Sequence, residues 1–452
     1  MQSSAGVEKP FTKRKARFTA SVDIEKRPMK IITQCRSCNS SSIEPFLNLG
    51  EQPFANSLLE SPKDSDPFYP LSLSFCLDCS LVQLNHTADP GELFSQYVWV
   101  TGTSSTAKKY AKIFSERVLQ ERPLQNEEYI LEAASNDGTV LKAFSDKGVS
   151  VLGVDPAQNI VAMANKAGIP TECHFFGENV AKEIVSRKGK AAVVIARNVV
   201  PHVANLRDFI AGLATALKED GMMVLEIHHA NTILNELHYD SIYHEHLCYF
   251  SFKAASALLT ERDFQIFRVD TSPISGGSMV LYASRKLKKQ PGPDVAEILY
   301  KEEQSQVNTW EAWKNFAKRT QEHKNQLLEL LDDKTNGHIV GWGASARSST
   351  LLNFCQIGTD RVTAIIDNNP MKQGLFTAGT HIPIQSAEKI MANKPDTVFV
   401  LAWNFFREIA KELYDKYQFR GNLIVPFPKN PTKINIKDVP LLGEPRWEVS
   451  HD

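Results

Sequence analysis

The chain has no excess of charge of either sign, because 51 lysine and arginine residues face 52 aspartate and glutamate residues. Proteins that bind nucleic acid through bulk charge usually carry a basic excess, so the composition argues against that class. No apolar run reaches the roughly 18 residues that suggest a membrane span. The N-terminal segment also lacks a secretory hydrophobic region, so we expect a cytoplasmic protein that acts away from membranes.

Cysteine is scarce and odd in number, with seven residues in a chain of 452. In a chain expected to be cytoplasmic, an odd number of cysteines favours metal ligands or free thiols over a disulfide framework. Two C-x-x-C pairs stand 37 residues apart, Cys35 with Cys38 and Cys76 with Cys79. Four thiolates complete the tetrahedral shell of zinc and leave no open position, so the pattern predicts a structural zinc site. Two unrelated pairs of free thiols, or a redox pair, remain the alternatives.

The middle of the chain alternates short apolar runs with helical patterns, at 129–134, 151–155, 191–195 and 222–227. This alternation predicts a parallel sheet that binds ligands at the carboxyl ends of its strands. Two further apolar runs, 264–270 and 278–283, follow each other without a helix between them. A parallel sheet that ends in an antiparallel hairpin is the layout of class I methyltransferases, and we predict that α/β fold here.

The glycine pattern of a dinucleotide site is missing, because only Gly138 and Gly153 stand near the first two runs. Little glycine is then available to admit a pyrophosphate. Asp155 ends the second run about 20 residues after the first turn, a position that suits the two hydroxyls of a ribose. Adenosine without phosphates fits this pattern and indicates S-adenosylmethionine. A helix-capping role for Asp137 and a turn role for Asp155 remain open.

Tyrosine, histidine and acidic side chains are concentrated between Tyr239 and Phe250, just beyond the predicted cofactor fold. Such a cluster indicates removal of a proton beside a bound cofactor, because histidine titrates near working pH. The alternative is that one or two of these side chains are structural. His228 and His229 have the same alternative, as simple strand-end histidines.

Five motifs in this order resemble the C-methyltransferases that build branched deoxysugars on nucleotide carriers. They are the paired C-x-x-C module, Glu132-x-x-Ser-Asn-Asp-Gly138, Tyr243-His-Glu-His246, Gly276-Gly-Ser278 and Gly341-Trp-Gly-Ala-Ser-Ala. The resemblance covers nearly all of the chain after residue 30. It implies that S-adenosylmethionine methylates a sugar carbon next to a keto group, usually on a thymidine-diphosphate carrier.

The resemblance also implies site residues. His246 is similar to the family's general base, with Tyr243 and Glu245 beside it, and His202 to its second active-site histidine. Tyr243 or His202 is expected to donate to the enolate oxygen. Expected cofactor contacts are Glu132, Ser135, Asn136, Asp137, Gly138, Asp155 and Asn198. The chain departs from the family at Ala134, at Glu226–Ala230 and at Ser275, which leaves the sugar open.

The last third of the chain predicts a second Rossmann-like domain, with Asp367 at the end of its second strand. Arg347 is expected to meet a substrate phosphate there, with Lys372 as a further candidate. The length favours about three domains. We expect a flexible tail at 1–30, a zinc-binding domain at 31–95, the methyltransferase domain at 96–290, a helical linker at 291–333, the second Rossmann-like domain at 334–440 and a tail at 441–452.

Two other functions compete with the sugar C-methyltransferase. One is a methyltransferase acting on RNA or protein, with the zinc module as a docking element. The other is a scaffold that keeps the enzyme fold without catalysis. The main hypothesis predicts a nucleotide-sugar as the substrate, no nucleic-acid or membrane partner, and a monomer or homodimer.

Overall fold

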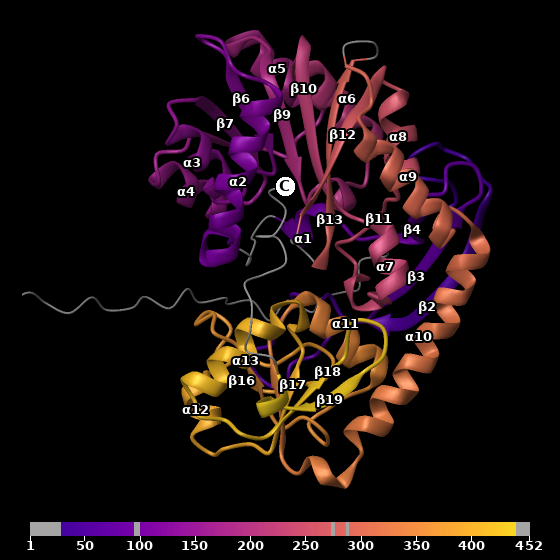
Figure 1. Ribbon diagram of the computed structural model, residues 1–452, viewed down its shortest axis with the longest axis vertical. Coiled ribbons are helices and arrows are strands. Elements are labelled where there is room, and N and C mark those ends of the chain that lie inside the picture. The colour runs from indigo at the N-terminus through magenta and orange to yellow at the C-terminus, as the bar shows by residue number, and fades with distance from the viewer. Residues whose placement is uncertain (1–28, 95–99, 273–275, 286–288, 440–452) are drawn as a thin grey trace, which may run out of the picture.

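The computed structural model describes residues 29–94, 100–272, 276–285 and 289–439. Most of both expected tails, Ser275 and the expected boundary at 95–96 lie outside the described residues. Figure 1 shows the central domain above the C-terminal domain, with a long helix running along one side of both. Among the described residues, no helix is long and apolar enough to cross a membrane.

The cysteine-containing module is built on an antiparallel sheet in the order β11-β4-β3-β2. Three of the strands belong to the module itself: β2 (Ile43–Gln52), β3 (Tyr69–Cys76) and β4 (Val82–Leu84). The fourth, β11 (Cys248–Tyr249), comes from the central domain and pairs with β4. The short strands β1 (Lys30–Ile31) and β5 (His86–Thr87) pair with each other, and α1 (Pro90–Phe94) follows. The module and the central domain therefore share one sheet.

The central domain has a seven-stranded sheet in the order β12-β13-β10-β9-β6-β7-β8. Its strands are β6 (Tyr129–Ala133), β7 (Ser150–Asp155), β8 (Thr171–Cys173), β9 (Ala191–Arg197), β10 (Leu217–His228), β12 (Phe264–Ser272) and β13 (Ser278–Arg285). The first five of these in chain order run parallel, and β13 is antiparallel to both β10 and β12. The predicted sheet with its closing hairpin is confirmed, and β8 is a strand that the sequence patterns did not indicate.

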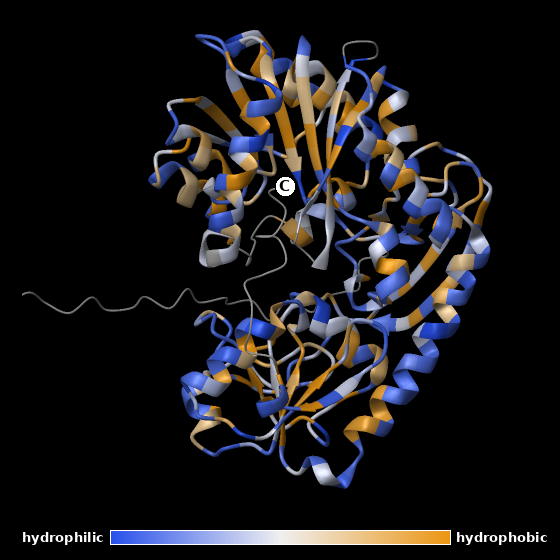
Figure 2. Cartoon of the chain, in the orientation of Figure 1, coloured by the Kyte–Doolittle hydropathy of each residue, from blue (hydrophilic) through white to orange (hydrophobic). Residues whose placement is uncertain are grey.

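Helices cover both faces of this sheet. One face packs against α2 (Ser105–Glu121) and α3 (Thr139–Ser145), whose apolar side chains join those of the strands in one core cluster. The other packs against α5 (Glu178–Lys188), α6 (Leu206–Ala216) and α8 (Phe252–Thr260). The domain also contains α4 (Gln158–Lys166) and α7 (Ala230–Glu236). Because both faces are covered, the inner strands β6, β7 and β9 are largely apolar, and the central strands are mostly orange in Figure 2.

Two helices connect the central and C-terminal domains, α9 (Pro293–Ser305) and α10 (Trp310–Leu331). Trp313 of α10 is buried against Phe46 of β2, with ring centroids 5.5 Å apart. The outward side of α10 is largely hydrophilic (Figure 2). The helix therefore binds the cysteine-containing module as well as spanning the two larger domains.

The C-terminal domain has a six-stranded sheet in the order β16-β15-β14-β17-β18-β19, parallel except for β19. Its strands are β14 (Ile339–Trp342), β15 (Ile365–Ile366), β16 (Ile384–Gln385), β17 (Thr397–Val400), β18 (Asn422–Val425) and β19 (Thr432–Asn435). Its helices are α11 (Ala346–Cys355), α12 (Ala387–Met391) and α13 (Phe406–Asp415). This is the predicted second Rossmann-like sheet.

Candidate active site

The four paired cysteines converge on one point. Their sulfur atoms all lie within 4.8 Å of one another, with 3.4 Å between Cys35 and Cys79 and 3.6 Å between Cys38 and Cys76. Zinc–sulfur bonds of about 2.3 Å in a tetrahedron place sulfurs about 3.8 Å apart, so the cluster has the size of a zinc shell. None of the four forms a disulfide. These residues would hold zinc with every position filled by protein, which makes the metal structural.

The carboxyl ends of the central strands open into a cleft of about 1570 Å³. One wall comes from the central domain and the other from the C-terminal domain, which contributes among others Arg347, Trp403 and Phe427. Pockets for one small molecule are usually about 300–1,000 Å³, so this cleft has room for two ligands side by side.

Five predicted cofactor residues line the central wall, and two of them have buried polar atoms that are unsatisfied among the described residues. Glu132 is 2% exposed, and its Oε2 has no partner among the described residues, nor does the buried Oγ of Ser135. Burial raises the pKa of Glu132 to about 8, although nearby Arg197 lowers it. The Ser135 side chain has room because residue 153 is a glycine: a Cβ at Gly153 would stand 2.3 Å from Ser135 Oγ. Buried polar atoms left open in a cleft are suited to a ligand.

Asp155 stands at the end of β7 and lines the cleft. Its two carboxylate oxygens accept the backbone N–H groups of Asn136 at 2.9 Å and Ala157 at 3.0 Å. Burial raises the pKa of Asp155, and these two donors partly offset the rise. The turn role left open by the sequence is therefore present, and a carboxylate has further lone pairs for ribose hydroxyls.

Two other predicted cofactor residues, Asp137 and Gly138, are not among the residues that line the cleft. Asp137 accepts the N–H groups of Gly102 at 3.0 Å and of Thr139, the first residue of α3, at 3.2 Å. Gly138 has a φ of 75°, in the left-handed region that favours glycine. Both residues shape the turn and cap the helix, the alternative that the sequence left open for Asp137.

Asn136 and Asn198 do line the cleft. Asn136 accepts the N–H of Thr101 at 2.9 Å, and Asn198, with a φ of 51°, donates its N–H to Glu226 O at 2.8 Å. Beside them, the segment after β8 brings His174, Phe175 and Phe176 to the cleft, and Phe175 is half exposed. The sequence did not indicate this segment, because the three residues of β8 are too few to show a strand pattern.

The catalytic candidates Tyr243 and His246 form a hydrogen-bonded pair that lines the cleft. His246 Nδ1 lies 2.8 Å from the carbonyl oxygen of Ser241, and because a carbonyl only accepts, Nδ1 carries the hydrogen. Burial lowers the pKa of His246 well below its usual range, so the ring is neutral and Nε2 accepts from Tyr243 OH at 2.7 Å. Burial also raises the pKa of Tyr243, which keeps the phenol protonated as the donor.

His202 lies beside this pair, at the end of the 3-10 helix Val200–His202. Its ring centroid is 4.7 Å from that of His246, edge to face, and burial lowers its pKa to about 4. Its buried Nδ1 has no partner among the described residues. The structure thus brings the two predicted histidines together at one end of the cleft.

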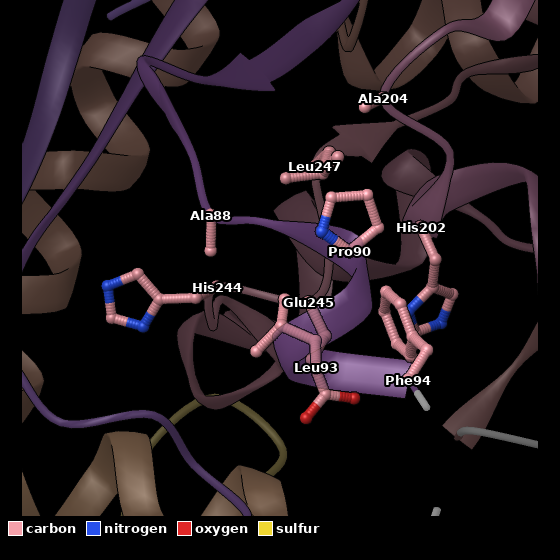
Figure 3. Close-up of a pocket in the computed structure, with 9 residues that line it drawn as sticks. All are labelled: Ala88, Pro90, Leu93, Phe94, His202, Ala204, His244, Glu245 and Leu247. Atoms are coloured by element: carbon pink, nitrogen blue, oxygen red, sulfur yellow. The ribbon is translucent and has the colours of Figure 1, made fainter. Parts of the chain in front are cut away.

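Glu245 points away from the main cleft into a small neighbouring pocket (Figure 3). It is 4% exposed and accepts a hydrogen bond from Asn56 Nδ2 of the cysteine-containing module. In Figure 3, His244 and His202 lie on opposite sides of Glu245. The His244 ring packs edge-on against Phe54 of the module, at 5.2 Å. The two outer residues of the 243–246 segment, Tyr243 and His246, therefore line the cleft, and the two inner residues, His244 and Glu245, contact the module.

The cysteine-containing module also binds the backbone of this segment. Leu84 N–H of β4 donates to Leu247 O at 2.9 Å, immediately before the β4–β11 pairing. On the other side of β4, Arg36 next to the ligand Cys35 donates to Leu84 O at 3.2 Å. The metal shell, β4 and the Tyr243–His246 pair are thus connected by short hydrogen-bonded steps.

Of the two predicted substrate residues, only Arg347 lines the cleft. Its guanidinium forms a two-point ion pair with the buried Asp240, at 2.8 and 2.9 Å, and lies 4.7 Å from the Trp403 ring. Lys372 instead donates to Ala344 O at 2.6 Å and lies 3.6 Å from Asp367, inside the C-terminal domain. Lys372 is not among the residues that line the cleft.

Comparisons with known proteins agree with this geometry. Three family models match: "Putative zinc binding domain" at residues 35–94, "Methyltransferase domain" at 106–269 and "C-methyltransferase C-terminal domain" at 273–428. C-methyltransferase NovU from Streptomyces niveus is 30% identical over 406 residues, 88% of this chain and 96% of that protein.

More distant similarity is confined to a smaller part of the chain. A ubiquinone biosynthesis O-methyltransferase from Rhodopseudomonas palustris is 25% identical over 96 residues, 21% of this chain and 38% of that protein. The structure of magnesium protoporphyrin IX methyltransferase from Synechocystis PCC 6803 with bound S-adenosylmethionine is 14% identical, with a TM-score of 0.30, over 40% of this chain and 79% of that chain.

The predicted cofactors, S-adenosylmethionine and a structural zinc ion, are confirmed by the matched domains and by the four-cysteine cluster. The near-complete coverage of a C-methyltransferase includes the zinc module, the cofactor domain and the C-terminal domain together. The chain therefore belongs to the family of S-adenosylmethionine-dependent C-methyltransferases.

Proposed function

We propose that this enzyme methylates a carbon adjacent to the ketone of a nucleotide-linked 4-keto deoxysugar, with thymidine diphosphate as the carrier. The observation that carries the proposal is the Tyr243–His246 pair, which lines the cleft with the imidazole in the tautomer that accepts a proton. A carbon becomes a methyl acceptor only after it loses a proton, and a neighbouring ketone makes that proton acidic.

The pair supplies the base in this proposal. When the substrate C–H bond breaks, its proton goes to the Tyr243 oxygen while the phenol's own proton passes to His246 Nε2. Ser241 O then stabilises the imidazolium through Nδ1–H, at 2.8 Å. Glu245 is a positioning residue, because its contact with Asn56 fixes the segment that carries the pair.

The central wall holds the cofactor. When bound, S-adenosylmethionine would supply an electrophilic methyl group to the carbon that has lost its proton, and would leave as S-adenosylhomocysteine. Asp155 binds the ribose hydroxyls in this proposal, while Glu132, Ser135, Asn136 and Asn198 surround the rest of the ligand. Asp137 and Gly138 act through the shape of the turn.

The side chains of the C-terminal wall suit a substrate that carries phosphate groups. Arg347, Arg407, Lys411 and Lys433 all line the cleft on that side, opposed there by Glu408. Cationic side chains around one cleft suit a diphosphate. Trp403 and Phe427, which line the same wall, offer apolar surface for the deoxysugar or the base. Lys372 has no part in this proposal.

The test is mass spectrometry of thymidine-diphosphate 4-keto deoxysugars, with hydroxyl or amino groups at carbon 3, incubated with the enzyme and S-adenosylmethionine. We expect a product one methylene heavier, with the new methyl group on carbon, and its loss in His246→Gln. If the wild-type enzyme binds S-adenosylmethionine but leaves every such sugar unmodified, the proposed substrate class is wrong.

A further inference from the structure

His228 is the last residue of β10, the strand next to the one that leads to Asn198, and its side chain lines the cleft. The residue is 7% exposed, and Nε2 is buried with no hydrogen-bond partner among the described residues. A buried polar atom that reaches a cleft without a partner is costly to fold unless a ligand completes it.

His229, the next residue, is a structural histidine whose ring has a hydrogen-bond partner. His229 Nε2 lies 2.7 Å from Glu302 Oε1, and Glu302 also binds Asn308 Nδ2 at 3.0 Å. His323 is satisfied likewise, because Tyr239 OH lies 2.9 Å from Nδ1 and Nε2 donates to Pro426 O at 2.7 Å. Both are core residues with assigned partners, whereas His228 Nε2 has no partner among the described residues and its side chain lines the cleft.

The surroundings keep the His228 ring neutral and fixed in place. Its ring stacks on that of His238, with centroids 5.8 Å apart, and His238 in turn packs on Trp403 at 4.6 Å. Burial lowers the pKa of His228 well below its usual range, and the positive charge of Arg347 lowers it further. A neutral imidazole in this setting offers an uncharged N–H donor rather than a cation.

The reaction needs such a donor. Deprotonation beside a ketone leaves negative charge on the ketone oxygen, and preorganised donors aimed at that oxygen accelerate such steps. The single O–H hydrogen of Tyr243 is already donated to His246 Nε2. Another group must therefore bind the oxygen, and the side chain of His228 lines the same cleft as the Tyr243–His246 pair.

We propose that His228 Nε2–H binds the ketone oxygen of the substrate and stabilises the enolate, opposite the Tyr243–His246 base. The inference rests on the proposed function and makes His228 a further catalytic residue. The C–H proton ends on the Tyr243–His246 pair. The electron pair resides on the enolate oxygen against His228 until carbon takes up the methyl group, and the ketone is then restored. His228 gives up no proton in the cycle.

The variants His228→Phe, His228→Gln and His228→Asn test this role in the full-length, zinc-loaded enzyme. Phe removes the donor and keeps the ring, Gln places an amide N–H near the position of Nε2, and Asn is too short to reach it. His338→Gln is the matched control, because His338 is an exposed histidine outside the cleft. The readouts are kcat for methylation, the Kd for S-adenosylmethionine, and exchange of the proton beside the ketone in deuterium oxide.

We expect His228→Phe to lower kcat and the exchange rate together by about 100-fold, the usual loss for one oxyanion donor, with the Kd for S-adenosylmethionine within about threefold. Gln should restore at least a tenth of the activity and Asn should not. If His228→Phe does not fold, the comparison of Gln with Asn gives the answer. An unchanged exchange rate in a folded Phe variant, or equal activities of Gln and Asn, would overturn the proposal. A wild-type enzyme that neither exchanges nor methylates any keto sugar would overturn the proposed function as well.

Discussion

Loss of zinc is expected to slow catalysis without weakening cofactor binding. Cys38→Ser is the suitable perturbation, because Cys38 is the most exposed of the four cysteines and its replacement disturbs packing least. Among the described residues of the module, only Pro90 and Phe94 line the large cleft, so the cofactor wall stays intact. The Tyr243–His246 segment, in contrast, is held by the module through the β4–β11 pairing, the Leu84–Leu247 bond and Asn56.

The size of the effect follows from these contacts. About three hydrogen bonds at roughly 1 kcal/mol each fix the segment, so their loss costs about 3 kcal/mol. A change of that size reduces the ratio of ordered to disordered segment by about 100-fold, and kcat falls by up to that factor. The Kd for S-adenosylmethionine should stay within about threefold.

The assay combines zinc content by elemental analysis, kcat for methylation and cofactor titration by calorimetry. Cys173→Ser is the matched control, since Cys173 is exposed and lies outside the four-cysteine cluster. A zinc-free Cys38→Ser enzyme with full kcat would refute this reasoning. So would a loss of cofactor affinity as large as the loss of kcat.

Three further outcomes are expected. Asp155→Ala should raise the Kd for S-adenosylmethionine by about 10- to 100-fold in calorimetry, because a carboxylate hydrogen bond to a ligand contributes roughly 1.5–3 kcal/mol; an unchanged Kd would limit Asp155 to its backbone contacts. Glu132→Gln should reduce the loss of folding stability, measured as Tm, that occurs as the pH rises. Folding raises the pKa of Glu132 from 4.5 to about 8, so the free energy of unfolding of the wild type decreases between these two pH values, by a few kcal/mol at most. A Gln variant that loses stability with pH as steeply as the wild type would contradict that. The pH profile of kcat/KM should show no acid limb at 6.5, because burial lowers the pKa of His246 well below that value and the pKa of His202 to about 4; an inflection at 6.5 would mean that the base is solvated.

The sequence was informative where one short segment carries the whole signal. The spacing of Cys35, Cys38, Cys76 and Cys79 was enough to place four ligands around one ion. Apolar runs located most strands of both sheets, because strands covered on both faces are apolar throughout. The fold class, the cofactor and the family were therefore predicted correctly.

The sequence was less informative where distant segments meet. It did not indicate that β11 leaves the central domain to join the cysteine-containing module, because two residues carry no period. For the same reason the direction of Glu245 was not foreseen: in a segment without regular structure, position does not determine which way a side chain points. Lys372, an expected phosphate contact, is engaged within its own domain.

The difference between His228 and His229 shows the same limit more sharply. His228 ends β10 and His229 precedes α7, and only the fold shows that the first side chain lines the cleft while the second contacts Glu302. In the sequence, the two residues shared the same alternative, as simple strand-end histidines.

The most direct test of the central claim is deuterium exchange without methyl transfer. The enzyme is incubated in deuterium oxide with a thymidine-diphosphate 4-keto deoxysugar and S-adenosylhomocysteine, which fills the cofactor site but has no methyl group to give. If Tyr243 and His246 are the base, the wild type incorporates one deuteron on the carbon beside the ketone, His246→Gln incorporates none, and Tyr243→Phe is slowed. Exchange that is as fast in His246→Gln as in the wild type would contradict the account.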